Sequence, residues 1–87
     1  MRIVWDEPKR QANLDKHGLD FANLTFDFIL SAAIAPARDG RFKAIGHNEG
    51  GMIVVIFAVL GTEAISIVSM RPASERERRL ATWLARC

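Results

Sequence analysis

Three polar side chains that could do chemistry recur at helical spacing near the start of the chain. Lys9, Asn13 and His17 stand four residues apart, with Lys16 beside them, so a helix would carry them on one stripe. An imidazole can exchange a proton near neutral pH. The alternative for His17 is structural, because a histidine in a last helical turn also interacts favourably with the helix dipole. This stripe is the first candidate for a functional surface.

Two arginines farther along the chain could add positive charge to the same site. Arg71 stands where a predicted strand meets the last predicted helix, and Arg41 follows an Asp-Gly turn. A guanidinium at either place can bind a phosphate held near the sheet edge. The alternative for Arg71 is an ion pair with Glu75 or Asp39.

Together these residue types suit metal-free cleavage of RNA. In that reaction a base activates the 2′-hydroxyl, an acid protonates the leaving oxygen, and cations stabilise the crowded phosphate. The two histidines lack metal-ligand spacing, and the single cysteine, Cys87, excludes a cysteine-based zinc site. We therefore expect neither a metal nor a cofactor. Glycine-rich phosphate loops are also missing from the sequence.

The composition describes an ordinary globular domain. With 87 residues, 49% hydrophobic and 25% charged, the chain predicts one domain over residues 1–87. Its net charge of +2 permits a polyanionic partner without demanding one. The longest apolar run, residues 52–60, is far shorter than the roughly 20 residues of a membrane helix. No signal peptide is evident, so we expect a cytoplasmic protein without membrane contact.

Hydrophobic periodicity and turn signals predict an α+β domain with helices on an antiparallel sheet, in the order β-α-α-β-β-β-α. The predicted elements are a strand over 1–5, helices over 6–18 and from 20 onward, strands over 41–47, 52–60 and 64–70, and a helix after Ser74. Residues 29–37 are expected to form an edge strand or an irregular crossing, since Pro36 disfavours a central strand. The apolar run 52–60 needs cover on both faces, from the C-terminal helix or from another chain.

The first candidate helix and the last strand resemble the signatures of BrnT-type toxins. The resemblance is carried first by Trp5-Asp6, Lys9, Asn13, Lys16-His17-Gly18 and Phe21 at matching spacings. It continues in Ile45-Gly46 and in the block from Ile67 to Ser74 that leads to Glu77-Arg78. It implies a RelE-like fold, a ribonuclease that halts translation, and a cognate antitoxin.

The same resemblance implies site residues and partners. The antitoxin would be similar to BrnA, with a ribbon-helix-helix part through which alone the complex contacts operator DNA. The substrate would be RNA, with ribosome association left open. Lys9, His17, Arg41 and Arg71 fall on the family's recurring polar positions, so we assign His17 to proton exchange and the three cations to phosphate. Asn13 and Lys16 are expected to bind substrate.

The chain departs from the family pattern at three places. The family usually carries an arginine near Leu60, another near Ser66, and a tyrosine in the final helix, whereas this chain contains no tyrosine. An alternative is therefore a catalytically weakened toxin-fold protein that acts with its antitoxin as a transcriptional co-repressor. A homodimeric structural domain is a third option.

Overall fold

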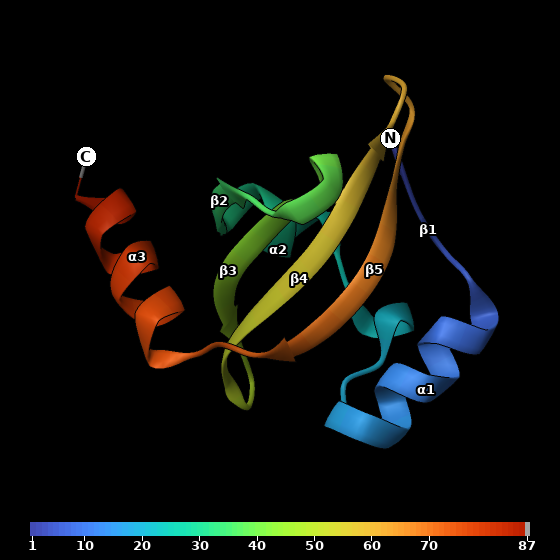
Figure 1. Cartoon of the computed structure of the whole chain (residues 1–87), viewed down its shortest axis with the longest axis horizontal. Coiled ribbons are helices and arrows are strands. Elements are labelled where there is room, and N and C mark those ends of the chain that lie inside the picture. The colour runs from blue at the N-terminus through green and yellow to red at the C-terminus, as the bar shows by residue number, and fades with distance from the viewer. Residues whose placement is uncertain (87) are drawn as a thin grey trace.

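A sheet of five strands organises the molecule, in the spatial order β1-β5-β4-β3-β2 (Figure 1). The strands of this computed structural model, which describes residues 1–86, are β1 (Arg2–Trp5), β2 (Ala33–Pro36), β3 (Phe42–Asn48), β4 (Gly51–Leu60) and β5 (Ala64–Pro72). The helices are α1 (Glu7–His17), α2 (Phe26–Ser31) and α3 (Glu75–Ala85), with short 3-10 turns η1 (Phe21–Asn23) and η2 (Arg38–Gly40). The α+β class predicted from the sequence is confirmed.

The sheet is mixed, so the prediction of an antiparallel sheet was wrong at one edge. Strands β2 to β5 form an antiparallel meander, but β1 pairs with β5 in parallel. The alternation of side chains predicts a strand but not the strand it pairs with. The pairing of β1 with β5, which are far apart in the sequence, is a tertiary contact that alternation does not predict. The predicted element order also lacked β2, which is the short edge strand foreseen as one option for residues 29–37.

The predicted second helix divides into two pieces. Asp20 accepts a hydrogen bond from the Ala22 amide at 2.9 Å, which begins η1 only. Thr25 then accepts from the Phe28 amide at 3.3 Å and begins α2. A second capping residue inside the apolar segment interrupts the helix that hydrophobic spacing alone predicts.

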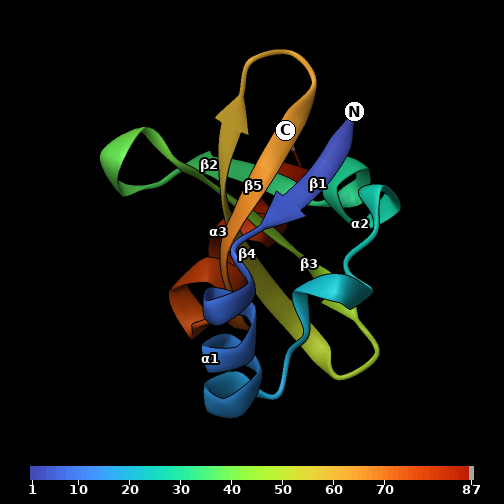
Figure 2. The ribbon, with the colours of Figure 1, turned by 90° about the vertical axis from the view of Figure 1, so that its right-hand side faces the viewer.

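Helices cover both faces of the sheet (Figure 2). On one face η1 and α2 enclose a core of Phe21 with inward side chains of β3, β4 and β5, and α1 lies beside this core, where Asn13 accepts a hydrogen bond from the Met70 amide of β5. Gly46 on β3 makes this packing possible, because a Cβ there would lie 2.9 Å from the Phe28 ring of α2. The close contact between β3 and α2 therefore depends on a glycine at position 46.

The opposite face is covered in part by α3, the C-terminal helix, as one option from the sequence proposed. Ala81 and Leu80 of α3 pack against Ile45 and Val54. The spacing of Leu80, Trp83, Leu84 and Cys87 predicts one apolar stripe on this helix, but Trp83 is 62% exposed and Cys87 lies outside the described residues. The remainder of this face, toward η2, stays open.

Candidate nucleic-acid interface

A basic pocket of about 530 Å³ lies on the part of the sheet that α3 leaves open. Its lining consists of Pro36, Ala37, Arg38, Arg41, Lys43, Ile56 and Arg71. Four of these residues are cations, and among residues 1–86 no carboxylate belongs to the lining. A concave site with one sign of charge attracts a polyanion.

Strand alternation explains why these cations meet. Phe42 and Ala44 face the core on the α1 side. Because side chains alternate along a strand, their neighbours Arg41 and Lys43 face the opposite side. Met70 also faces the α1 side, which turns Arg71 toward the pocket. The structure thus brings two of the predicted site residues, Arg41 and Arg71, into one pocket.

The turn η2 supplies the outer wall of this pocket. Asp39 and Gly40 both adopt positive φ angles, 58° and 73°, which aspartate and glycine tolerate better than most residues. The Arg41 amide donates to the Arg38 carbonyl at 3.1 Å, and the Ala37 amide donates to the Arg41 carbonyl at 2.9 Å. The tight turn therefore holds Arg38 and Arg41 side by side at the rim.

Arg71 is bound to a carboxylate of α3. Its Nη1 and Nη2 donate to Oε1 and Oε2 of Glu77 at 2.7 and 2.8 Å. These bonds, together with the amide and hydroxyl of Ser74, lower the pKa of Glu77 far below its usual range, with burial opposing the shift. The sequence offered Glu75 or Asp39 as the partner; Glu75 pairs instead with Arg79.

Lys43 and Glu77 are the site residues that sequence reasoning missed. Lys43 donates to Glu77 Oε2 at 3.4 Å, and its side chain is 24% exposed. The sequence could have indicated Lys43, which stands two residues after Arg41 on a predicted strand, because the two side chains must then lie on the same face. The spacing of Ser74 and Glu77 predicts a capping box at the start of α3, which the structure confirms, but this spacing gives no sign that Glu77 also pairs with Arg71 and Lys43.

Asn13, predicted to bind substrate, is buried and hydrogen-bonded within the fold. It is 8% exposed, its amide nitrogen donates to the Leu19 carbonyl at 3.0 Å, and its amide oxygen accepts from the Met70 amide at 3.1 Å and the Ser69 hydroxyl at 3.3 Å. Strand β1 pairs with β5 only as far as Ile67, so the Asn13 amide occupies the edge of β5 beyond it. The contacts of Asn13 are those of a residue that fastens α1 to the sheet.

The other candidates on α1 stand apart from the basic pocket. Lys9 and Lys16 are exposed and His17 is half-buried, and in the described part of the chain none of them lines the pocket. The predicted boundaries of this helix are correct, with Asp6 accepting from the Lys9 amide at 3.3 Å and Gly18 at φ 69°. Folding therefore separates the predicted cations into two groups.

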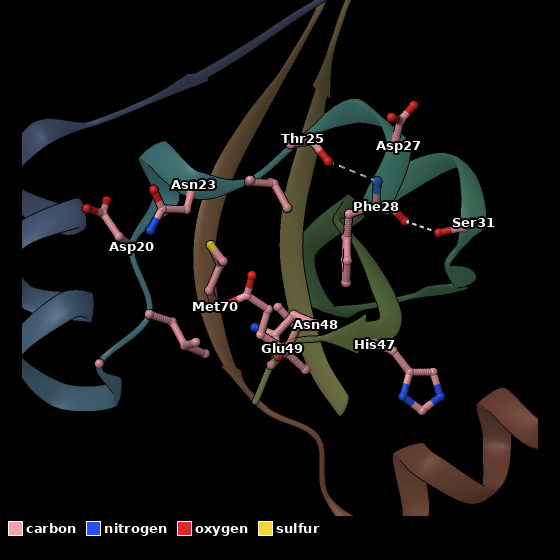
Figure 3. Close-up of a pocket in the computed structure, with 14 residues that line it drawn as sticks. Asp20, Asn23, Thr25, Asp27, Phe28, Ser31, His47, Asn48, Glu49 and Met70 are labelled. Carbon is pink, nitrogen blue, oxygen red and sulfur yellow. Dashed lines mark hydrogen bonds between the residues drawn. The ribbon is translucent and has the colours of Figure 1, made fainter. Parts of the chain in front are cut away.

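A second hollow of about 530 Å³ lies on the opposite face, between η1, α2 and the β3–β4 turn (Figure 3). Its apolar lining residues include Leu24, Phe28 and Met70, and the carboxylates along its lining are Asp20, Asp27 and Glu49. In Figure 3 His47 points away from the other labelled side chains. This acidic lining makes the second hollow a poor site for RNA phosphate.

The side chains and helices of residues 1–86 also bear on two other kinds of site. No group of three or more histidine, cysteine, aspartate or glutamate side chains is arranged to hold a metal ion. No helix of that part of the chain is long and apolar enough to cross a membrane.

Comparisons with known proteins agree with this fold. A family model described as the ribonuclease toxin, BrnT, of type II toxin–antitoxin systems matches residues 5–77. The crystal structure of the Brucella abortus ribonuclease toxin BrnT matches with a TM-score of 0.80 and 55% sequence identity, over 86% of this chain and 99% of that chain. None of the curated proteins matches.

The small α+β domain with its basic sheet face is therefore a toxin of the type II toxin–antitoxin class. More narrowly, the chain belongs to the BrnT ribonuclease toxin family. Membership in this class implies an antitoxin partner. The relation to the RelE fold stays a prediction.

Proposed function

We propose that this protein is an endoribonuclease that cleaves RNA without a metal ion, and that it inhibits translation until a cognate antitoxin neutralises it. The observation that carries the proposal is the basic pocket, in which Arg38, Arg41, Lys43 and Arg71 converge on an uncovered sheet face. Family membership supplies the reaction class. The pocket supplies the charge that a phosphodiester and its transition state need.

Within this proposal the cations have different tasks. Arg41 and Lys43 bind the phosphate at the reacting bond, while Arg71 acts from its fixed place on Glu77. Lys9, Lys16 and His17 form a second group on α1, where a longer RNA reaches them. His17 is the candidate for proton exchange, although it does not line the basic pocket, and the His17→Ala variant tests this role.

A cleavage assay with purified protein tests the proposal. A labelled RNA is incubated with the unaltered chain and with the Arg41→Ala, Lys43→Ala, Lys9→Ala and His17→Ala variants, in the presence of a chelator. We expect Arg41→Ala and Lys43→Ala to slow cleavage about tenfold or more. Arg86→Ala, which removes the same charge from the far end of α3, should cleave normally. Dependence on added metal, or equal rates for all variants, would contradict the proposal.

The alternative is a co-repressor that binds its antitoxin but cleaves RNA poorly. One observation favours it: Ser66 lies between Ile65 and Ile67, which face the α1 side, so it faces the same side as the basic pocket. Leu60 pairs near the same end of β5. At Ser66, where the resemblance to BrnT-type toxins predicts an arginine, this chain therefore has no positive charge on the face of the basic pocket. A BrnA-like antitoxin with a ribbon-helix-helix part would then supply all contact with operator DNA.

Induction of the protein alone in cells separates the two functions. The endoribonuclease halts growth and leaves new RNA ends, which sequencing of the RNA ends maps. The co-repressor leaves growth unchanged but tightens the binding of its antitoxin to operator DNA.

A further inference from the structure

The geometry points to Glu77 as a positioning residue of the basic pocket, one that holds Arg71 throughout and holds Lys43 only until an RNA phosphate arrives. This inference rests on the proposed RNA function of the pocket. In the absence of RNA, the Glu77 carboxylate accepts the hydrogen bond from Lys43 that a phosphate oxygen accepts when RNA binds. Glu77 itself does not touch the substrate.

The Glu77 carboxylate is held from several directions. Oε1 accepts from Arg71 Nη1 at 2.7 Å and from the Ser74 amide at 2.9 Å, while Oε2 accepts from Arg71 Nη2 at 2.8 Å and Lys43 Nζ at 3.4 Å. The side chain is only 7% exposed. A carboxylate bound on both oxygens at the N-terminus of α3 cannot turn away without breaking its cap.

The two cations on Glu77 are bound differently. Arg71 makes two short parallel bonds, the arrangement in which a guanidinium gives up least freedom for each bond formed. Lys43 makes one long contact from a flexible stem, and it lines the pocket. A phosphate that enters can therefore take Lys43 while the Arg71–Glu77 pair stays intact.

This division of roles predicts how the charge of Glu77 affects RNA. The carboxylate repels an incoming phosphate and competes for Lys43, so its charge must weaken RNA binding. Glu77→Gln keeps the size of the side chain and an acceptor oxygen for the Ser74 amide but removes the charge. We expect this variant to lower KM for RNA without raising kcat, because Arg71 loses part of its anchor as Lys43 is released.

The experiment measures affinity for an RNA oligonucleotide in which every 2′-hydroxyl is methylated, so that it cannot be cleaved. Glu77→Gln should bind it about fivefold more tightly than the unaltered chain. Glu75→Gln is the matched control, since it removes one charge from the same first turn of α3 but from an exposed pair with Arg79. An equal gain from both variants, or no gain from a folded Glu77→Gln, would overturn the inference.

A second measurement uses the unaltered chain and does not depend on the folding of a variant. Side-chain nitrogen resonances of lysine and arginine are followed by NMR while the methylated RNA is added. The Lys43 signal should move, whereas the Arg71 Nη signals should keep their positions. A static Lys43, or movement of Arg71 together with Lys43, would overturn the inference while RNA binding stands. A chain that binds no RNA would overturn the proposed function as well.

Discussion

Arg71 at the end of β5 and Glu77 in the first turn of α3 join the last strand to the last helix through parallel hydrogen bonds of 2.7 and 2.8 Å. The same pair borders the basic pocket and supports the N-terminal cap of α3. Stability and the proposed RNA binding therefore depend on one contact, and variants must separate the two effects.

Removal of the arginine should be costly. Arg71→Ala leaves the Glu77 carboxylate buried with only Lys43 and the cap, and we expect the free energy of unfolding to fall by about 3 kcal/mol. Urea unfolding at neutral pH measures the change. The double variant Arg71→Met with Glu77→Leu should lose less, because no buried charge remains unpaired. A double variant less stable than Arg71→Ala would refute this explanation.

Acid should weaken the same contact. Hydrogen bonds from Arg71 lower the pKa of Glu77 from its ordinary 4.5, so the unfolded chain binds the proton first as the pH falls. The stabilisation is therefore complete above about pH 4.5 and is lost progressively at lower pH. Urea unfolding between about pH 5 and pH 3 should show a shallower loss for Glu77→Gln than for the unaltered chain. Some loss remains in the variant, because Arg10 also lowers the pKa of Asp20. Equal losses would contradict the prediction.

Asn13 should matter for stability and not for chemistry. Asn13→Ala leaves the Met70 amide and the Leu19 carbonyl without their partner, which should cost about 3 kcal/mol in the free energy of unfolding. The exposed Asn23 provides the control, and Asn23→Ala should change stability by less than about 0.5 kcal/mol. At a temperature where both variants are folded, RNA cleavage should equal that of the unaltered chain. A cleavage defect in folded Asn13→Ala would restore its predicted role in substrate binding.

Addition of an arginine at position 66 should strengthen RNA binding. Ser66→Arg places a new cation on the face of the basic pocket, near a position where the resemblance to BrnT-type toxins predicts one. We expect the dependence of affinity on salt to steepen by about 0.7 in logarithmic slope, as one further phosphate contact requires. Thr62→Arg adds the same charge in the β4–β5 turn and should change the slope less. If the two variants gain equally, net charge and not position explains the effect.

The sequence by itself determined the local elements of this protein. The capping box of Ser74 and Glu77, the Asp6 cap and the Gly18 end of α1 follow from bonds between residues close along the chain, and each is present. The meander of β3, β4 and β5 follows equally from alternation and turns. Such contacts require no knowledge of the remaining fold.

Only the tertiary structure decided which side chains share a site. From the sequence alone, Asn13 belongs to a polar stripe on a helix. In the folded protein its side-chain oxygen accepts a hydrogen bond from the Met70 amide at the unpaired edge of β5. Arg71 pairs with Glu77 because the turn between β5 and α3 brings the two side chains together. Lys43 lies in the same pocket as Arg41 and Arg71 because the pairing of β3, β4 and β5 places these side chains on one face of the sheet. His17 lies outside that pocket because α1 lies at the edge of the sheet. Contacts between distant segments depend on register and packing, which the order of residues specifies only through the whole fold.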